Sequence, residues 1–300
     1  MSLQSWEITI TNLGRLRSSE PMSKHTTLGV GGPARWFFRP SGRDALIKAL
    51  PLIPADIPVF PLGRGSNLLF SDAGFAGLIL DLGSLTSIKK LDCQSVQALA
   101  GARMSKMAMF CADHELEGAE FMATVPGDVG GGIAMNAGAF GQQVSNTLHH
   151  VELIHRQGQI EILSSGQLNM GYRRCHLPAG STILGGRFRL SAGKAEDIRQ
   201  RMRSMRERRS RSQPLAQPNC GSVFKNPLET YAATLLEQAG LKGTGVGKAR
   251  FSEKHANFIV NEGGATSSDI LALIKRAQET VEQLFSIRLE PEVRIVGKEP

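Results

Sequence analysis

The chain has 300 residues, of which 41% are hydrophobic and 21% charged, and its formal net charge is +8. This balance is typical of a globular protein with room for two or three domains, and no apolar run approaches the roughly 18 residues of a membrane span. The first twenty residues lack a basic start followed by an apolar stretch, so we expect no export signal and no membrane association. The basic surplus admits nucleic acid or small anionic ligands as partners.

Four cysteines, Cys93, Cys111, Cys175 and Cys220, are scattered without a CxxC pair. This pattern argues against a zinc site and is typical of reduced thiols in a cytoplasm. We therefore expect a cytoplasmic protein without a metal.

The first 200 residues predict short strands with few helices. Residues 34–40 predict a strand and residues 42–53 a helix, and residues 59–82 read as strand, glycine turn, short strand, turn and strand. A strand over 95–102, a helix over 103–116, a hairpin over 151–165 and a strand over 181–191 follow.

The charged segment over 193–214 predicts a helix that ends before Pro214 and leads into a last domain. There, residues 229–240 predict a helix that stops at Gly240. A second helix over 266–286 is capped by Thr266 with Asp269, and residues 289–297 predict a closing strand. The predicted apolar face of the helix over 266–286 consists of Ile270, Ile274, Ala277, Val281 and Leu284. The fold class is α+β with mixed sheets.

Two clusters hold much of the glycine, which totals 33 residues. The first is LGRGSNLL over 62–69, and the second is VPGDVGGGIAMNAGAFG over 125–141. Glycine lets successive backbone N–H groups point into one concavity, which suits a phosphate. A set of tight turns is the plainer alternative, and neither cluster is a GxGxxG fingerprint or a P-loop. Together the clusters favour a dinucleotide-sized ligand.

Seven motifs then carry a family resemblance: HTTLGVGGPARWFF, LGRGSNLLFSDAGFAGLIL, EFMATVPGDVGGGIAMNAGAFG, GYRR, GSVFKNP, AGLKGTGVGKARFSEKHANFIVN and LEPEVRIVG. In this order, over roughly residues 25–297, the chain resembles the UDP-N-acetylenolpyruvoylglucosamine reductases. That family consists of flavoenzymes that complete UDP-N-acetylmuramic acid for bacterial peptidoglycan.

The resemblance implies a two-subdomain FAD-binding domain of the vanillyl-alcohol-oxidase type, followed by a smaller α+β substrate domain. We expect FAD-binding subdomains over 1–55 and 56–198 and the substrate domain over 199–300. The resemblance also implies non-covalent FAD and NADPH as co-substrate. The residues expected to bind FAD are Thr27, Gly29, Gly31, Gly63, Gly65, Ser66, Asn67, Pro126, Gly127, Gly131 and Asn136.

In the implied reaction, a hydride reaches the enolpyruvyl methylene carbon and the neighbouring carbon takes a proton. The protein must supply that proton and stabilise the enolate. Arg173 in GYRR suits the enolate, because a guanidinium can fork onto a carboxylate. On the closing strand, Glu290, Glu292 and Arg294 share one face, so spacing alone cannot choose between the two carboxylates. The resemblance points to Glu292.

The sequence PNCGSVFKNP places Cys220 and Ser222 one glycine apart. Cysteine is the stronger acid and the better nucleophile, but the implied reaction forms no covalent adduct. The resemblance places the proton donor at Ser222, and we interpret Cys220 as a small buried residue.

The resemblance also implies substrate contacts. Asn226 is expected on the diphosphate, with Lys225 as a phosphate partner nearby. His255 is interpreted as structural. No tyrosine lies between Tyr172 and Tyr231, which indicates the shorter subtype without a tyrosine loop. The residues expected to bind substrate are Tyr172, Arg211, Lys225, Asn226, Lys254 and Asn257.

Two other functions remain open. Arginines concentrated between Arg199 and Arg211 would suit a nucleic-acid-binding protein, although the run contains no aromatic residue for stacking. An FAD-dependent oxidase of the same superfold is the alternative among flavoenzymes. We expect the reductase, as a monomer and without nucleic acid as a partner.

Overall fold

The computed structural model describes residues 5–297. The chain forms two compact units, and each is assembled from separate stretches of sequence. The first unit comprises residues up to Ser18, Trp36–Gly63 and Gly77–Arg208. The second comprises Ser19–Arg35, Arg64–Ala76 and the residues from Arg209 onward. The division into three consecutive segments stays a prediction.

Most elements of the first unit are strands. One sheet has the order β1-β2-β5-β3, and a five-stranded sheet has the order β12-β11-β13-β7-β6. The helices are α1 (Ser5–Thr11), α2 (Arg43–Ala49), α3 (Met104–Asp113) and α4 (Val129–Ala134), with 3-10 turns at Leu50–Leu52, Glu120–Ala123, Val144–Asn146 and Ser165–Leu168. Three strands have residues in both units: β1 (Gly14–Pro21), β2 (Pro33–Pro40) and β5 (Phe75–Asp81). The other strands are β3 (Val59–Leu62), β6 (Ile88–Lys90), β7 (Ser95–Leu99), β8 (Leu116–Glu117), β9 (Gly138–Ala139), β10 (Gln142–Gln143), β11 (Leu148–Ile154), β12 (Ile160–Ser164), β13 (Thr182–Arg189) and β14 (Ser191–Ala192).

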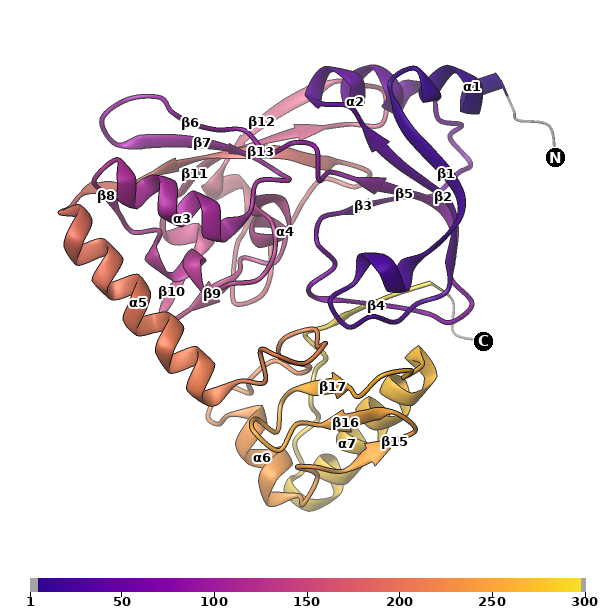
Figure 1. The fold of residues 1–300 in the computed structure, drawn as a ribbon, viewed down its shortest axis with the longest axis vertical. Coiled ribbons are helices and arrows are strands. Elements are labelled where there is room, and N and C mark those ends of the chain that lie inside the picture. Colours follow the sequence, from indigo (N-terminus) through magenta and orange to yellow (C-terminus); the bar gives the residue numbers. More distant parts are fainter. Residues whose placement is uncertain (1–4, 298–300) are drawn as a thin grey trace. The chain divides into compact units, whose positions relative to one another are not determined.

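The five-stranded sheet is antiparallel, and its central strand β13 is buried along most of its length. Val151 and Leu153 on β11 and Phe188 on β13 point into the core, and α3 and α4 lie against this part of the unit (Figure 1). The predicted hairpin over 151–165 is confirmed by the pairing of β11 with β12.

The second unit is a smaller α+β assembly. Its elements are a 3-10 turn (Met22–His25), β4 (Leu68–Phe70), α6 (Ala232–Gln238), β15 (Gly245–Val246), β16 (Ala249–Phe251), β17 (Ile259–Asn261), α7 (Ser267–Phe285) and β18 (Arg294–Val296). Strands β15, β16 and β17 form an antiparallel sheet, and β18 pairs in parallel with β4. The long helix α5 (Ala195–Ser212) begins in the first unit and ends in the second.

Helix α7 confirms its predicted start and most of its predicted face. The Thr266 hydroxyl accepts the Asp269 N–H at 3.1 Å, and the Asp269 carboxylate accepts the Thr266 N–H at 3.0 Å. Ile270, Ile274, Ala277 and Val281 are buried. The prediction for Leu284 was wrong, since it is 59% exposed. Helical period sets the direction of a side chain, but it does not set how far the covering core extends along the helix.

Candidate active site

Ser222 and Cys220 point into different surroundings. Cys220 is 2% exposed within the apolar core of the second unit, and burial raises the pKa of its thiol to about 12. Ser222 is half-buried, and its hydroxyl has no hydrogen-bond partner among residues 5–297. Between them Gly221 has φ +79°, a left-handed conformation in which glycine is favoured. The interpretation of Cys220 as a small buried residue is confirmed.

The segment after Ser222 lies against the segment that carries Glu292. The N–H groups of Glu292 and Val293 both donate to the Val223 carbonyl, at 2.7 and 3.3 Å. One residue further on, the Lys225 N–H donates to the Glu290 carbonyl at 2.9 Å. The structure therefore brings together two of the three predicted catalytic residues, although they are separated by 70 positions in sequence.

The predicted strand over 289–297 is mostly absent. Strand β18 begins at Arg294, so Glu290 and Glu292 do not alternate with Arg294 on one strand. The reason is that the Val223 carbonyl accepts two successive N–H groups, which departs from the one-to-one pairing of a ladder. The side chains of the two acids also differ in partner, since Glu290 forms an ion pair with Lys225. The geometry therefore separates two carboxylates that spacing left equivalent.

The first glycine cluster forms a turn that leads into β4. Gly65 has φ +62°, and a Cβ there would lie 2.2 Å from the His25 carbonyl oxygen. The N–H groups of Arg64 and Gly65 donate to no acceptor among the described residues. Unpaired N–H groups next to a left-handed glycine form a nest for an anion, so this turn fits the diphosphate of a dinucleotide.

Asn67 links that turn to Glu292. Its side-chain amide donates to the Glu292 carbonyl at 3.0 Å, and its own carbonyl accepts the Arg294 N–H at 3.0 Å. Contact of Asn67 and its neighbour Ser66 with a cofactor stays a prediction.

The segment Thr27–Gly31 belongs to the same unit. The Thr27 hydroxyl donates to the Asn219 carbonyl at 2.6 Å, and the Thr27 N–H donates to the Gly65 carbonyl at 3.2 Å. Both Gly29 and Gly31 have positive φ. This segment therefore contacts the first glycine turn and the Ser222 segment, and binding of FAD by its residues stays a prediction.

The second glycine cluster lies in the first unit and contains α4. The outer two of its three consecutive glycines pack inward, because a Cβ at Gly130 would meet Ala100 and a Cβ at Gly132 would meet Met104. Gly131 between them is exposed and faces open space. Of these three glycines, only Gly131 leaves its backbone open to the close approach of a flat ligand. Pro126 and Gly127 precede the helix.

Asn136 holds the turn that carries Arg173. Its amide donates to the Gly171 carbonyl at 2.9 Å and its oxygen accepts the Ser145 N–H at 2.9 Å, so this buried side chain contacts the protein itself. Arg173 sits at the turn with φ +53°, and its guanidinium donates to the Gly138 carbonyl at 3.1 Å. A non-glycine residue with positive φ costs energy and is often found at functional sites. That Arg173 meets Ser222 and Glu292 at a substrate stays a prediction.

Several predicted substrate residues have partners within the chain. The Asn226 side chain accepts the Ala232 N–H at the start of α6, and the Lys254 ammonium donates to the Ser210 carbonyl. Tyr172 is half-exposed, with the Arg173 guanidinium 5.1 Å from its ring centre. Arg211 is exposed on α5. Substrate binding by these residues and by Lys225 stays a prediction.

Asn257 is 2% exposed, and its side chain forms hydrogen bonds with the backbone of Phe224. Its expected contact with substrate stays a prediction, since the amide is engaged by the protein in this structure. His255 beside it packs its ring on Phe258 at 4.8 Å between centroids, consistent with a structural role.

Sequence reasoning missed Asn219. Its side-chain oxygen accepts the Gly221 N–H at 2.9 Å, which closes the turn before Ser222. An Asn two positions before a Gly is a turn signal that could have identified it.

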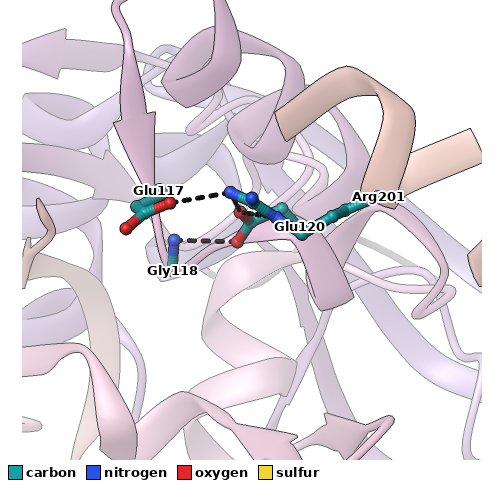
Figure 2. Close-up of polar contacts among 4 residues, drawn as sticks. All are labelled: Glu117, Gly118, Glu120 and Arg201. Carbon is teal, nitrogen blue, oxygen red and sulfur yellow. Dashed lines mark hydrogen bonds and ion pairs between the residues drawn. The ribbon is translucent and has the colours of Figure 1, made fainter. Parts of the chain in front are cut away.

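The basic helix α5 is anchored by acidic residues of the first unit (Figure 2). The Arg201 guanidinium donates to Glu120 at 2.6 Å and to Glu117 at 2.8 Å, and Glu120 also accepts the Gly118 N–H at 2.8 Å. Arg199 pairs with Asp113 at 2.7 Å. Two arginines of the run are therefore neutralised within the unit, which weakens the nucleic-acid interpretation.

Neither a membrane span nor a metal cluster is found among the described residues. Between residues 5 and 297, no helix is both long and apolar enough to cross a membrane. The same residues contain no group of three or more His, Cys, Asp or Glu side chains that could hold a metal ion.

Two family models match the chain. Residues 34–164 match an FAD binding domain, and residues 213–296 match the C-terminal domain of UDP-N-acetylenolpyruvoylglucosamine reductase. The expected α+β fold, with an FAD-binding part followed by a smaller C-terminal domain, is confirmed.

Individual proteins of known sequence or structure are similar to this chain over 95% of its length. The UDP-N-acetylenolpyruvoylglucosamine reductase of Alkalilimnicola ehrlichii is 41% identical over 95% of this chain and 96% of its own length. That of Thiobacillus denitrificans is 42% identical over 95% and 93%. The crystal structure of the Thermus caldophilus reductase superposes with a TM-score of 0.81 at 32% identity, covering 95% of this chain and 99% of that one. The chain belongs to the UDP-N-acetylenolpyruvoylglucosamine reductase family.

Proposed function

We propose that this chain uses NADPH and FAD to reduce UDP-N-acetylenolpyruvoylglucosamine to UDP-N-acetylmuramate, a precursor of peptidoglycan. The observation that carries the residue assignment is the pairing of the Ser222 and Glu292 segments through the Val223 carbonyl. A free hydroxyl and a carboxyl group then lie on adjacent backbone segments of one unit. This arrangement suits the delivery of one proton.

The residues present fit FAD. In the second unit, the turn before β4 offers the N–H groups of Arg64 and Gly65 to a diphosphate. In the first unit, Gly131 offers a backbone surface without a side chain. We assign the remaining cofactor contacts to Thr27–Gly31, Ser66 and the Pro126–Gly127 turn. When bound, FAD supplies hydride transfer from NADPH to the substrate's methylene carbon.

We assign the proton donor to Ser222. A hydroxyl is a weak acid, but the carbon that it protonates belongs to an enolate, which is a strong base. The burial of the Cys220 thiol in the apolar core supports this choice over Cys220. Glu292 lies on the paired segment, where a carboxyl group in its protonated form could share in the transfer. The Arg173 guanidinium would bind the substrate carboxylate and stabilise the enolate.

The substrate's nucleotide diphosphate requires cations and amides. Lys225, Asn226, Lys254, Arg211 and Tyr172 supply such groups, and Lys225 would exchange its ion pair with Glu290 for a phosphate. We further propose that the enzyme works in the cytoplasm as a monomer and that nucleic acid is not a partner.

Colour tests the proposed function. The protein should be yellow as purified, and NADPH should bleach it in the absence of oxygen. Addition of the enolpyruvyl sugar nucleotide should restore the colour without oxygen. Return of colour with oxygen alone would support the oxidase alternative, and a colourless protein retained on polynucleotide at moderate salt would support a nucleic-acid-binding protein.

A further inference from the structure

The side chain of Asn257 forms a closed pair of hydrogen bonds with one residue. Its oxygen accepts the Phe224 N–H at 2.9 Å, and its amide donates to the Phe224 carbonyl at 2.8 Å. The side chain is buried, with 2% of the residue exposed. Both backbone polar groups of the buried residue Phe224 are thus satisfied by one side chain, where a neighbouring strand would usually satisfy them.

The Asn257 backbone extends this clamp toward Ser222. The Val223 N–H donates to the Asn257 carbonyl at 2.9 Å, so the two residues that follow Ser222 are both held by Asn257. The Val223 carbonyl on the other side accepts the Glu292 N–H at 2.7 Å. The Asn257 side chain therefore accepts a hydrogen bond from the Val223–Phe224 peptide, and the carbonyl of that same peptide pairs with the Glu292 segment.

The Ser222 hydroxyl itself makes no hydrogen bond within residues 5–297. Its direction is therefore set by the backbone on either side of it. On one side the Asn219 side chain accepts the Gly221 N–H, and on the other side Asn257 fixes Val223 and Phe224. A general acid must lie within hydrogen-bond reach of the atom that it protonates, so a small displacement of this backbone reduces the rate.

We propose that Asn257 is a positioning residue for Ser222, with its buried amide holding the backbone that aims the hydroxyl at the substrate carbon. This inference rests on the proposed function. It assigns Asn257 a role through Phe224, in place of direct contact with the sugar nucleotide.

The test compares three variants of the FAD-loaded protein. Asn257→Ala removes both side-chain hydrogen bonds, whereas Asn257→Asp keeps the acceptor for the Phe224 N–H and places an oxygen against the Phe224 carbonyl. Thr266→Ala removes the cap of α7 and serves as the control, because it destabilises the same unit without touching the Ser222 segment. Each variant is reduced with NADPH and then mixed anaerobically with the enolpyruvyl sugar nucleotide. The bleaching rate, the recolouring rate and the solvent deuterium isotope effect are measured.

Both Asn257 variants should bleach within about twofold of the wild-type rate. They should recolour at least about tenfold more slowly, because a positioned acid accelerates proton transfer by about 10²–10⁴-fold and a misplaced one loses part of that factor. Their solvent isotope effect on recolouring should rise, because proton delivery becomes slower, and the new stereocentre should form as a mixture. Thr266→Ala should change none of these readouts.

Wild-type recolouring and stereochemistry in both Asn257 variants would overturn the inference, as would a loss that appears only in substrate affinity. If Asn257→Ala does not fold, Asn257→Asp decides. Failure of the wild-type protein to recolour with the sugar nucleotide would instead reject the proposed function.

Discussion

Alanine at Gly65 and at Gly221 separates two ways in which a glycine can be required. Both residues have a left-handed backbone, with φ of +62° and +79°. A Cβ at Gly221 meets nothing within 4 Å, whereas a Cβ at Gly65 would lie 2.2 Å from the His25 carbonyl oxygen and 2.9 Å from the Thr26 Cα. The conformational cost is therefore shared, and the steric cost belongs to Gly65 alone.

The magnitudes follow from these two terms. A left-handed alanine costs roughly 1–2 kcal/mol, and about 0.4–1 kcal/mol of that is offset because alanine restricts the unfolded chain. Gly221→Ala should therefore lower the free energy of unfolding by about 1 kcal/mol. Gly65→Ala must also displace backbone atoms, which adds roughly 1–3 kcal/mol.

Urea unfolding of the FAD-free proteins measures both free energies without any contribution from ligand. Gly65→Ala should be the less stable variant by at least about 1 kcal/mol. Equal losses would refute the reasoning, because they would mean that the His25–Gly65 contact does not constrain the turn.

Three further predictions concern other parts of the second unit and the exposed thiol. Thr266→Ala should lower the free energy of unfolding by about 1 kcal/mol in urea titrations, because the N-terminal cap of α7 is lost; no loss would contradict the cap. Burial lowers the pKa of His255, so the unfolded state binds a proton that the folded state does not. Stability should therefore fall as the pH drops below about 6.5, and His255→Gln should reduce this slope; an unchanged slope would exclude His255 as its source. With a thiol reagent at pH 8, exposed Cys93 should react fast, while Cys220, with a pKa of about 12, should react only on unfolding. Rapid labelling of Cys220 in the folded protein would contradict its burial.

Local signals in the sequence predicted the elements well. Alternation around Gln157-Gly158 predicted the β11–β12 hairpin, and the Thr266–Asp269 spacing predicted the cap of α7. Both features are formed by residues that are close in sequence, so a local sequence pattern is enough to predict them. The prediction for the closing strand was less accurate, because Glu290 and Glu292 pair with residues near position 224, and no local pattern records that contact.

In the candidate site, too, some features could be predicted from the sequence and others depend on contacts between distant residues. Residue chemistry and the family resemblance selected Ser222 and Glu292, but the resemblance alone chose Glu292 over Glu290. The structure adds contacts that the sequence could not show, while the catalytic roles stay a prediction. Gly221 has a left-handed backbone between the buried Cys220 and the half-buried Ser222, and Glu290 forms an ion pair with Lys225. The role of Asn257 could not be predicted either, because a buried amide looks the same in sequence as a ligand-binding one.

The assignment of Ser222 is tested most directly by rapid mixing of NADPH-reduced protein with the enolpyruvyl sugar nucleotide in the absence of oxygen. Ser222→Ala should bleach normally and recolour about 10²–10⁴-fold more slowly than wild type, while Cys220→Ala should recolour at close to the wild-type rate. The opposite pattern, with recolouring abolished by Cys220→Ala and retained by Ser222→Ala, would contradict the account.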